Sequence, residues 1–320
     1  MQKVLLTDHA WPDDSIERSV IEGAGFELFS GPANPAPVTE IDALCRQIKP
    51  DAILTCWAQV SSSAIEATAN LKIVARLGVG LDNIAVATAS ERGIWVTNVP
   101  DYCVEEVSDH AVGMALAWTR GLVFFDRAVR QGHWEPSKAK LRRLSTLTCG
   151  IVGFGRIGRM TAKKLAGFGC RLMAYDPFPS APTAGVEGVD LDTLFATSDI
   201  VIVHAPLNDK THHLVNRERL GHMKQGGLLI NVSRGGVVDS DAMVEALDLG
   251  ILDAAAVDVL ESEPLVPEGM IRHPRCIFTP HVAFSSDASL IDLRRRAAEE
   301  VVRVLKGEKP RNPVNKPAGR

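Results

Sequence analysis

The sequence predicts an α/β protein built from two doubly wound parallel-sheet domains. Short aliphatic and β-branched runs alternate with amphipathic helical patterns, and this alternation occurs twice along the 320 residues. A helical pattern at Val104–Thr119 separates the two series, and a second one at Asp287–Leu305 follows them. A chain of this length is expected to form two cores of ordinary size.

Each series supplies its own set of strands. The first is predicted at Val4–Thr7, Phe26–Phe29, Ala52–Thr55, Ile73–Arg76 and Trp95–Val96, with helical patterns such as Ser15–Glu22 and Glu40–Ile48 between strands. The second is predicted at Cys149–Val152, Arg171–Tyr175, Ile200–His204, Leu228–Val232, Ala254–Val257 and Cys276–Phe278. Strands separated by helices pair in parallel, because a crossover of that length returns the chain to the same end of the sheet.

The C-terminal helix is expected to return to the first domain. The predicted boundaries are therefore residues 1–100 with 287–320 for a discontinuous domain, and residues 101–286 for a domain inserted into it.

Composition and charge exclude several classes of protein. Hydrophobic residues make up 46% and charged residues 23%, which is typical of a soluble globular protein. Lys and Arg number 35 against 39 Asp and Glu, a net charge of −4, with no basic run that could follow a phosphate backbone. We therefore expect no nucleic-acid partner.

Neither a membrane segment nor a metal site is expected. The most apolar window, Ala111–Phe125, is interrupted by Arg120 and is too short to span a bilayer, so it is predicted to be a buried helix. The N-terminus has the pattern of a short strand and not of an export signal. The six cysteines are scattered without a C-x-x-C pair, which argues against a zinc site and a disulfide framework and favours the reducing cytoplasm.

A glycine-rich turn directly follows the predicted strand Cys149–Val152. Gly153, Gly155 and Gly158 fit the G-x-G-x-x-G pattern, and the helical pattern Arg159–Gly167 comes after them. In this context the first glycine permits a tight turn, the second lets a pyrophosphate approach the backbone, and the third brings helix and sheet together. The pattern predicts a dinucleotide site, and the alternative is a tight turn without a ligand.

Asp176 ends the next predicted strand, 18 residues past Gly158. A carboxylate at this place can accept hydrogen bonds from ribose hydroxyls and repels a 2′-phosphate. No Arg follows before Arg217, so NAD is favoured over NADP.

Two later strands end in side chains suited to anion binding and proton transfer. Arg234, between Ser233 and two glycines, can hold a carboxylate through two hydrogen bonds. His281, in Thr279-Pro280-His281, has a side chain that exchanges a proton near neutral pH, and Glu263 is a candidate to fix its tautomer. From spacing alone, a strand-end His is more often structural, and a single Arg is more often part of a surface ion pair.

Taken together, these motifs resemble the D-isomer-specific 2-hydroxyacid dehydrogenase family over nearly the whole chain. The glycine-rich turn with Asp176, the stretch Asn231–Gly236, the segment Ala256–Val259 leading to Glu261–Pro264, and Thr279–His281 stand in the family's order. The resemblance implies a Rossmann NAD-binding domain inserted into a flavodoxin-like substrate domain, and a hydride transfer between NAD(H) and C2 of a small D-2-hydroxy acid or its 2-oxo form. It also implies Arg234, Glu263 and His281 as the catalytic set.

The resemblance further assigns binding residues and a partner. Residues that contact NAD would be Gly153, Gly155, Arg156, Ile157, Gly158, Asp176, His204, Ala205, Pro206, Val232, Ser233, Arg234, Asp258 (near the nicotinamide) and His281. The substrate would contact Trp57, Gly78, Val79 and Gly80 together with Arg234 and His281. The family's homodimers pair through their dinucleotide domains, so the helix Val104–Thr119 is a candidate interface element, and Trp134 is a candidate for the same surface.

The substrate prediction rests on departures from the phosphoglycerate-oxidising members. Those members carry an Arg-Ser-x-Thr stretch where this chain has Thr55–Gln59, and some have an additional regulatory domain after the helix at which this chain nearly ends. Hydroxypyruvate, glyoxylate or a related acid is therefore favoured over phosphoglycerate, with Trp57 and Phe284 edging a small pocket.

A second class of function stays open at this point. The segments Asn98–Glu106 and His281–Ser286 are similar to the C-terminal-binding-protein branch, which would make the chain an NADH-responsive, corepressor-like binding protein. The presence of all three catalytic residue types favours an enzyme.

Overall fold

The computed structural model describes residues 1–9, 11–178 and 183–319. The chain forms two compact units. The first unit comprises Met1–Tyr102 and Ser286–Arg320, and the second comprises Cys103–Ser285.

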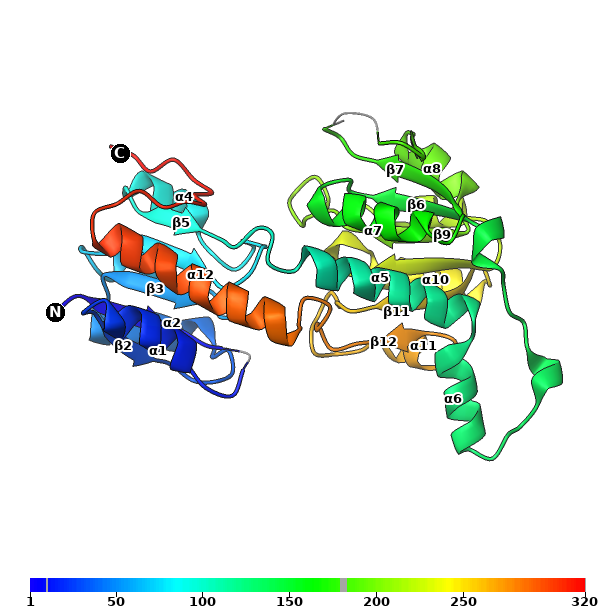
Figure 1. Ribbon diagram of the computed structural model, residues 1–320, viewed down its shortest axis with the longest axis horizontal. Helices are drawn as coiled ribbons and strands as arrows, with labels where there is room; N and C mark the ends of the chain where they lie inside the picture. Colours follow the sequence, from blue (N-terminus) through cyan, green and yellow to red (C-terminus); the bar gives the residue numbers. More distant parts are fainter. Residues whose placement is uncertain (10, 179–182, 320) are drawn as a thin grey trace. The chain divides into compact units, whose positions relative to one another are not determined.

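The first unit has a five-stranded sheet whose strand pairs are all parallel (Figure 1). Its strands are β1 (Lys3–Leu6), β2 (Glu27–Ser30), β3 (Ala52–Thr55), β4 (Ile73–Arg76) and β5 (Trp95–Thr97), in the order β2-β1-β3-β4-β5. This is the flavodoxin-like order, which places ligands at the carboxyl ends of the strands. The helices of this unit are α1 (Ser15–Gly23), α2 (Val38–Ile48), α3 (Ser62–Glu66), α4 (Val86–Glu91) and α12 (Asp287–Leu305).

Helix α12 covers one face of this sheet with α1. Its apolar side chains Leu293, Ala297 and Val301 pack with Val4, Leu54 and other strand residues in one core cluster. A buried ion pair also joins the two helices: Arg294 Nη2 lies 2.8 Å from Glu17 Oε2. The C-terminal segment is therefore part of the first unit's core.

The second unit has a seven-stranded sheet, and again all its strand pairs are parallel. Its strands are β6 (Thr148–Val152), β7 (Arg171–Tyr175), β8 (Val186–Gly188), β9 (Ile200–Val203), β10 (Gly227–Asn231), β11 (Leu252–Val257) and β12 (Ile277–Phe278). The order β12-β11-β10-β9-β6-β7-β8 is that of the Rossmann fold, 3-2-1-4-5-6, with one strand added at the far edge. The predicted fold class is confirmed.

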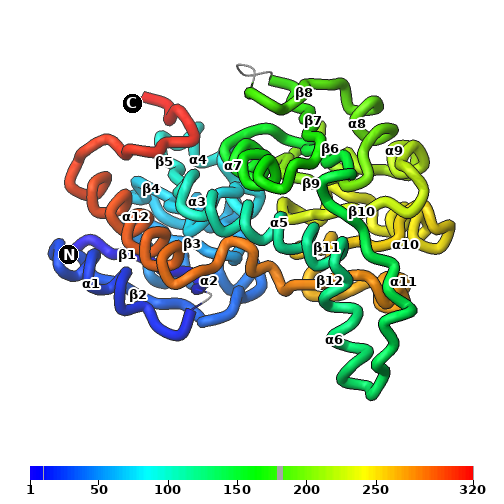
Figure 2. The backbone as a smooth tube through the Cα atoms, turned by 45° about the vertical axis from the view of Figure 1, so that its right-hand side comes forward, coloured from blue at the N-terminus to red at the C-terminus, as the bar shows by residue number. Residues whose placement is uncertain are grey.

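Helices cover both faces of this second sheet, as Figure 2 shows around β6 and β9. The helices of this unit are α5 (Val104–Thr119), α6 (Leu122–Arg130), α7 (Arg156–Ala166), α8 (Leu191–Thr197), α9 (Arg217–Gly221), α10 (Ser240–Asp248) and α11 (Glu268–Ile271). None of the described helices is long and apolar enough to cross a membrane.

The prediction of a single buried helix over Ala111–Phe125 is wrong. Helix α5 ends at Thr119, and Gly121, with φ +62°, begins a separate helix. Helix α5 buries Val107, Ala111 and other residues, whereas α6 buries none and extends away from the sheet (Figure 1). The apolar run therefore continues from a buried helix into an exposed one.

Candidate active site

The glycines of the turn after β6 have three different surroundings. A Cβ atom on Gly153, whose φ is +92°, would lie 2.7 Å from the Ala205 backbone nitrogen, and one on Gly158 would lie 2.2 Å from the Gly153 carbonyl oxygen. A Cβ atom on Gly155 would meet nothing within 4 Å. The first and third glycines are therefore needed for packing within the chain, and the second faces open space.

Helix α7 begins beside this open space. Gly155 is its N-cap and provides no capping side chain, and Arg156 and Ile157 occupy its first turn. The first backbone N–H groups of a helix lack partners within the helix and attract anions. This end of α7 fits a pyrophosphate.

Asp176 follows β7 beside the same turn. Its Oδ2 accepts a hydrogen bond from the Phe154 backbone N–H (2.8 Å), and its Oδ1 accepts one from the Phe178 N–H (2.9 Å). These bonds fix the carboxylate in orientation, and each oxygen keeps a further lone pair for a hydroxyl group. The turn, the helix end and Asp176 together fit an adenine dinucleotide.

His204 lies beside the turn at the end of β9. Its Nε2 is 2.9 Å from Thr161 Oγ1, while its Nδ1 is buried and has no hydrogen-bond partner in the described part of the chain. Burial lowers the pKa of His204 to about 3, so the ring is neutral. Ala205 and Pro206 follow it, and Ala205 contacts the position where Gly153 must lack a side chain.

A buried asparagine shapes the segment that carries Arg234. Asn231 Oδ1 accepts hydrogen bonds from the Ser233 N–H (3.1 Å) and hydroxyl (2.9 Å), and its Nδ2 donates to the Arg234 carbonyl (3.0 Å). Val232 between them is buried. Residue 235 must be glycine, because a Cβ atom there would lie 2.0 Å from the Leu260 carbonyl. The Arg234 segment therefore lies directly against the segment that leads to Glu263.

His281 and Glu263 are brought together across 18 positions of sequence. His281 Nδ1 is 2.9 Å from Glu263 Oε2, and Glu263 Oε1 accepts the Leu260 N–H at 3.0 Å. Partial burial by itself raises the pKa of Glu263, but the hydrogen bond and charge of His281, the Leu260 N–H and the charge of Arg234 outweigh it and hold that pKa below its usual value. Glu263 is thus an ionised carboxylate, and it accepts a hydrogen bond from the Nδ1–H group of His281.

Asp258, at the end of β11, fixes the turn that carries His281. Its buried carboxylate accepts hydrogen bonds from the Thr279 hydroxyl (2.5 Å) and from the N–H groups of Val282 (3.0 Å) and Ala283 (2.9 Å). His110 of α5 adds a contact of 2.9 Å from its Nε2 to Thr279 Oγ1. Sequence reasoning missed His110, which lies 169 positions from Thr279 and belongs to no spacing motif.

The predicted substrate residues Trp57, Gly78, Val79 and Gly80 all lie in the first unit. The buried Asp8 carboxylate accepts hydrogen bonds from the N–H groups of Cys56, Trp57 and Ala58 at 3.0, 2.7 and 3.1 Å, and so orders the backbone at Trp57.

The glycine segment beyond β4 is equally constrained. A Cβ atom on Gly78 would lie 2.8 Å from Arg76 Nη1, and Asn98 Nδ2 donates to the Val79 carbonyl at 2.7 Å. Asp8, Arg76 and Asn98 were not among the predicted site residues. Asp8 and Asn98 hold the backbone of segments distant in sequence, and Arg76 packs against the backbone of the nearby Gly78, so no motif marks them.

The second unit therefore combines a dinucleotide-binding turn with an arginine and an imidazole–carboxylate pair. Arg234, Asp258 and His281 follow the neighbouring strands β10, β11 and β12, at the edge where such sheets bind their ligands. Fold and site together define a nicotinamide-dependent oxidoreductase.

Comparison with known proteins defines the class more narrowly. Residues 112–283 match the family model described as the D-isomer specific 2-hydroxyacid dehydrogenase, NAD binding domain. A hydroxypyruvate reductase of Thermotoga maritima is 39% identical over 247 residues, which cover 76% of this chain and 79% of that protein. A D-3-phosphoglycerate dehydrogenase of Archaeoglobus fulgidus is 38% identical over 264 residues, which cover 81% of this chain but only 50% of that protein.

Solved structures give the same result. The D-lactate dehydrogenase of Aquifex aeolicus, complexed with NAD and lactic acid, superimposes with a TM-score of 0.84 at 27% identity, covering 95% of this chain and 96% of that one. The chain belongs to the D-isomer-specific 2-hydroxyacid dehydrogenase family. The predicted family, its oxidoreductase class and a nicotinamide dinucleotide cofactor are confirmed.

Proposed function

We propose that this chain reduces a small 2-oxo acid, such as hydroxypyruvate or glyoxylate, to the D-2-hydroxy acid with NADH, or catalyses the reverse oxidation. The observation that supports this most directly is the 2.9 Å contact between His281 and Glu263 at the carboxyl end of β12. In this proposal, residues 101–286 form the NAD-binding domain, which also carries Arg234, Glu263 and His281, and residues 1–100 with 287–320 form the substrate domain.

The proposed roles follow from the charges at the site. Bound NADH supplies the hydride that C2 receives. The Arg234 guanidinium holds the substrate carboxylate and polarises the C2 carbonyl. His281 gives the proton to the C2 oxygen from Nε2, because its Nδ1 faces Glu263. Glu263 fixes this tautomer and stabilises the imidazolium before transfer.

We assign the preference for NAD over NADP to Asp176. Its two oxygens are oriented by the N–H groups of Phe154 and Phe178, so the negative charge stays beside the turn where a 2′-phosphate would have to enter. For Asp176→Ala we expect weaker discrimination against NADPH.

Purified protein with NADH and a panel of 2-oxo acids, followed by absorbance at the nicotinamide band, tests the activity. We expect turnover with hydroxypyruvate or glyoxylate above that with phosphohydroxypyruvate, the oxidised form of phosphoglycerate. His281→Ala should lower kcat by about 10²–10⁴-fold with little change in the Kd for NADH. His222→Ala, which removes an exposed imidazole elsewhere in the second unit, is the control.

Unchanged turnover of His281→Ala would remove His281 from the mechanism. Tight NADH binding with no turnover on any acid of the panel would instead support the NADH-responsive binding protein.

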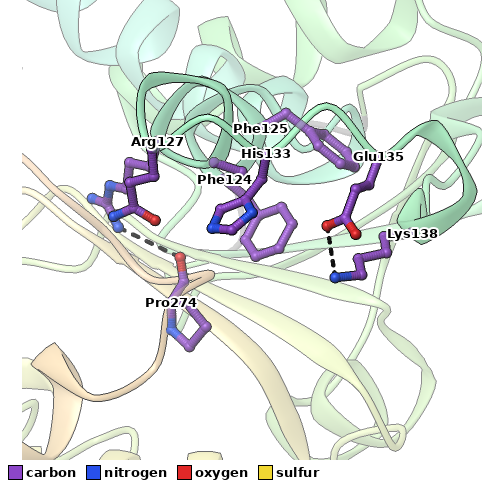
Figure 3. A pocket seen from close by; sticks show the side chains of 9 residues that line it. Phe124, Phe125, Arg127, His133, Glu135, Lys138 and Pro274 are labelled. Carbon is purple, nitrogen blue, oxygen red and sulfur yellow. Dashed lines mark hydrogen bonds and ion pairs between the residues drawn. The ribbon is translucent and has the colours of Figure 1, made fainter.

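We also propose a homodimer that forms through α6 and the residues after it. The apolar side chains Leu122, Val129 and Trp134 of this segment are 58%, 46% and 80% exposed. The same segment also helps to line a pocket of about 280 Å³ with Phe124, Phe125 and His133. Figure 3 shows these side chains. Much of the apolar surface of α5, the interface helix expected from the sequence, is already buried within its own unit, so we move the proposed contact to α6.

Light scattering after size exclusion tests the dimer. Leu122→Asp should shift the mass toward the monomer, because a charge would be buried in the interface. Leu249→Asp changes a leucine that is 62% exposed elsewhere in the second unit and should leave the mass unchanged. Equal masses for both variants would contradict an interface at α6.

We propose a cytoplasmic location, which is supported by the six buried free thiols and by the need for a pool of NAD(H).

A further inference from the structure

A cluster of two imidazoles and a carboxylate lies outside the catalytic set. His212 and His213, in the connection between β9 and α9, meet Glu261, which follows β11. Each of the three residues offers one ligand atom, and these atoms lie within 4.8 Å of one another. Nothing in the proposed reaction uses these residues.

The backbone conformation at His213 brings the imidazoles of His212 and His213 to the same side of the chain. His213 adopts φ +49°, and in this left-handed conformation consecutive side chains do not alternate as they do in a strand. The two rings stack with their centroids 4.0 Å apart. His212 is exposed, and neither of its ring nitrogens has a hydrogen bond in the part of the chain that the structure describes.

His213 lies between two carboxylates, of which Glu261 is in hydrogen-bond contact. Its Nε2 lies 2.5 Å from Glu261 Oε1, and its Nδ1 lies 3.9 Å from Asp239 Oδ2. Metal-binding histidines usually direct their second nitrogen toward a carboxylate or carbonyl, which fixes the tautomer and raises the basicity of the ligand nitrogen. Asp239 lies on this side of the ring at a distance longer than a hydrogen bond, and its other oxygen, Oδ1, accepts the Ala242 N–H at 3.0 Å.

Glu261 is oriented in the same way. Its Oε2 accepts the Ser240 N–H at 3.3 Å, which turns Oε1 toward the imidazoles. The backbone of the two segments is also joined, since the His213 N–H donates to the Gly236 carbonyl (2.9 Å) and the Asp239 N–H to the Val215 carbonyl (2.9 Å). The donor set is therefore supported by contacts that do not depend on any ion.

Space and charge beside the cluster favour a cation. A pocket of about 280 Å³ is lined by His213, Asp239, Asp241 and Glu261 among other residues, and no Lys or Arg lines it. It has room for an ion that keeps one or two waters. Two nitrogens and one oxygen suit Zn²⁺, whereas Ca²⁺ and Mg²⁺ prefer oxygen ligands throughout.

We propose that His212, His213 and Glu261 form a binding site for Zn²⁺ or a similar divalent transition metal, with water completing a tetrahedral coordination. Binding requires the exposed His212 ring to turn out of its stack, because the lone pair of an imidazole nitrogen lies in the ring plane. The ion replaces the hydrogen bond between His213 and Glu261 and joins the β9–α9 connection to the segment 261–263. Because Glu263 lies in that segment, the ion would also restrain the carboxylate that contacts His281.

Full-length protein freed of metal with EDTA and dialysed against ZnCl₂ at neutral pH tests the proposal. We expect one Zn²⁺ per chain by elemental analysis and an increase in Tm. With CoCl₂ as the probe, we expect the intense visible absorption of tetrahedral Co²⁺. His212→Ala and Glu261→Gln should each weaken Zn²⁺ binding at least about tenfold and abolish the Co²⁺ band, and Asp239→Asn should weaken binding about 10–100-fold.

His222→Ala, which removes an exposed imidazole of the same unit, should bind Zn²⁺ like the parent. Circular dichroism in EDTA checks that each variant is folded, and the exposed position of His212 makes its variant the safest comparison. Equal Zn²⁺ affinity of the parent, His212→Ala and Glu261→Gln would overturn the proposal. So would a bound ion that is lost in His281→Ala but kept in His212→Ala, because it would then belong to the His281–Glu263 pair.

Discussion

Alanine substitutions at two glycines of one turn should damage different properties of the protein, and the structure explains why. Gly155 and Gly158 are three positions apart, yet a Cβ atom on Gly155 meets nothing within 4 Å, and one on Gly158 would lie 2.2 Å from the Gly153 carbonyl oxygen. We expect Gly158→Ala to damage the fold of the second unit and Gly155→Ala to damage cofactor binding alone.

The sizes of both effects can be estimated. An ordinary contact of a Cβ atom begins near 3.4 Å, so Gly158→Ala forces backbone to move by more than 1 Å; overpacking of this kind costs roughly 1–3 kcal/mol. For Gly155→Ala, a less favourable N-cap costs up to about 1 kcal/mol and the reduced freedom of the unfolded chain returns about 0.4–1 kcal/mol. Its net effect on stability should be small.

The effect of Gly155→Ala on the cofactor comes from the added methyl group. This group would stand between the first turn of α7 and a pyrophosphate. Loss of one charge-assisted hydrogen bond, about 1.5–3 kcal/mol, raises the Kd for NADH about 10- to 150-fold.

Urea unfolding followed by circular dichroism measures the stability of each variant, and fluorescence titration with NADH measures its affinity. A Gly158→Ala protein as stable as the parent would show that the packing of α7 against Gly153 is not as described. NADH affinity unchanged in Gly155→Ala would show that the pyrophosphate does not lie at this helix end.

Three further predictions concern buried polar groups. Arg294→Met leaves the carboxylate of Glu17 buried without its partner and should reduce the free energy of unfolding by about 3–5 kcal/mol, measured by urea titration. In the folded protein the pKa of His204 is about 3, below the usual 6.5, so between these pH values the unfolded chain binds a proton that the folded chain does not. The free energy of unfolding should therefore fall as the pH drops from 6.5 toward 3, and it should fall less steeply in His204→Gln. Urea unfolding midpoints at several pH values measure both slopes. Asp258→Asn replaces a carboxylate that accepts hydrogen bonds from two N–H groups and a hydroxyl with an amide, whose NH₂ group cannot accept them. The turn that carries His281 should loosen, and kcat should fall about 10–100-fold. An unchanged kcat would argue against this role of Asp258.

Local sequence patterns were sufficient for the long elements and for the glycine-rich turn. The bounds predicted for Val104–Thr119 and Asp287–Leu305 agree with α5 and α12, because a long helix with one buried face repeats its apolar residues at a constant spacing. The sequence missed β8, Val186–Gly188, which is a three-residue edge strand with only one β-branched residue. It also placed the start of α7 three residues late, because the helix begins inside the glycine motif.

The candidate site was predictable as a set of residue types, but its geometry was not. The order of the motifs indicated Arg234, Glu263 and His281. Each of them comes after a strand, β10, β11 or β12, that the hydrophobic pattern had predicted. Which nitrogen of His281 meets Glu263, and that Asp258 supports the turn of His281, depend on contacts between strands.

For this protein, then, the sequence alone determined the class of fold, and its motifs predicted a dinucleotide turn and the side chains that we propose to be reactive. Only the tertiary structure decided the contact of Asp8 with the backbone at Trp57, the support of Thr279 by His110, and the meeting of His213 with Glu261. The physical reason is that periodicity and turn chemistry depend on neighbouring residues. A hydrogen bond between distant segments depends instead on how the whole chain packs, and no local pattern predicts it.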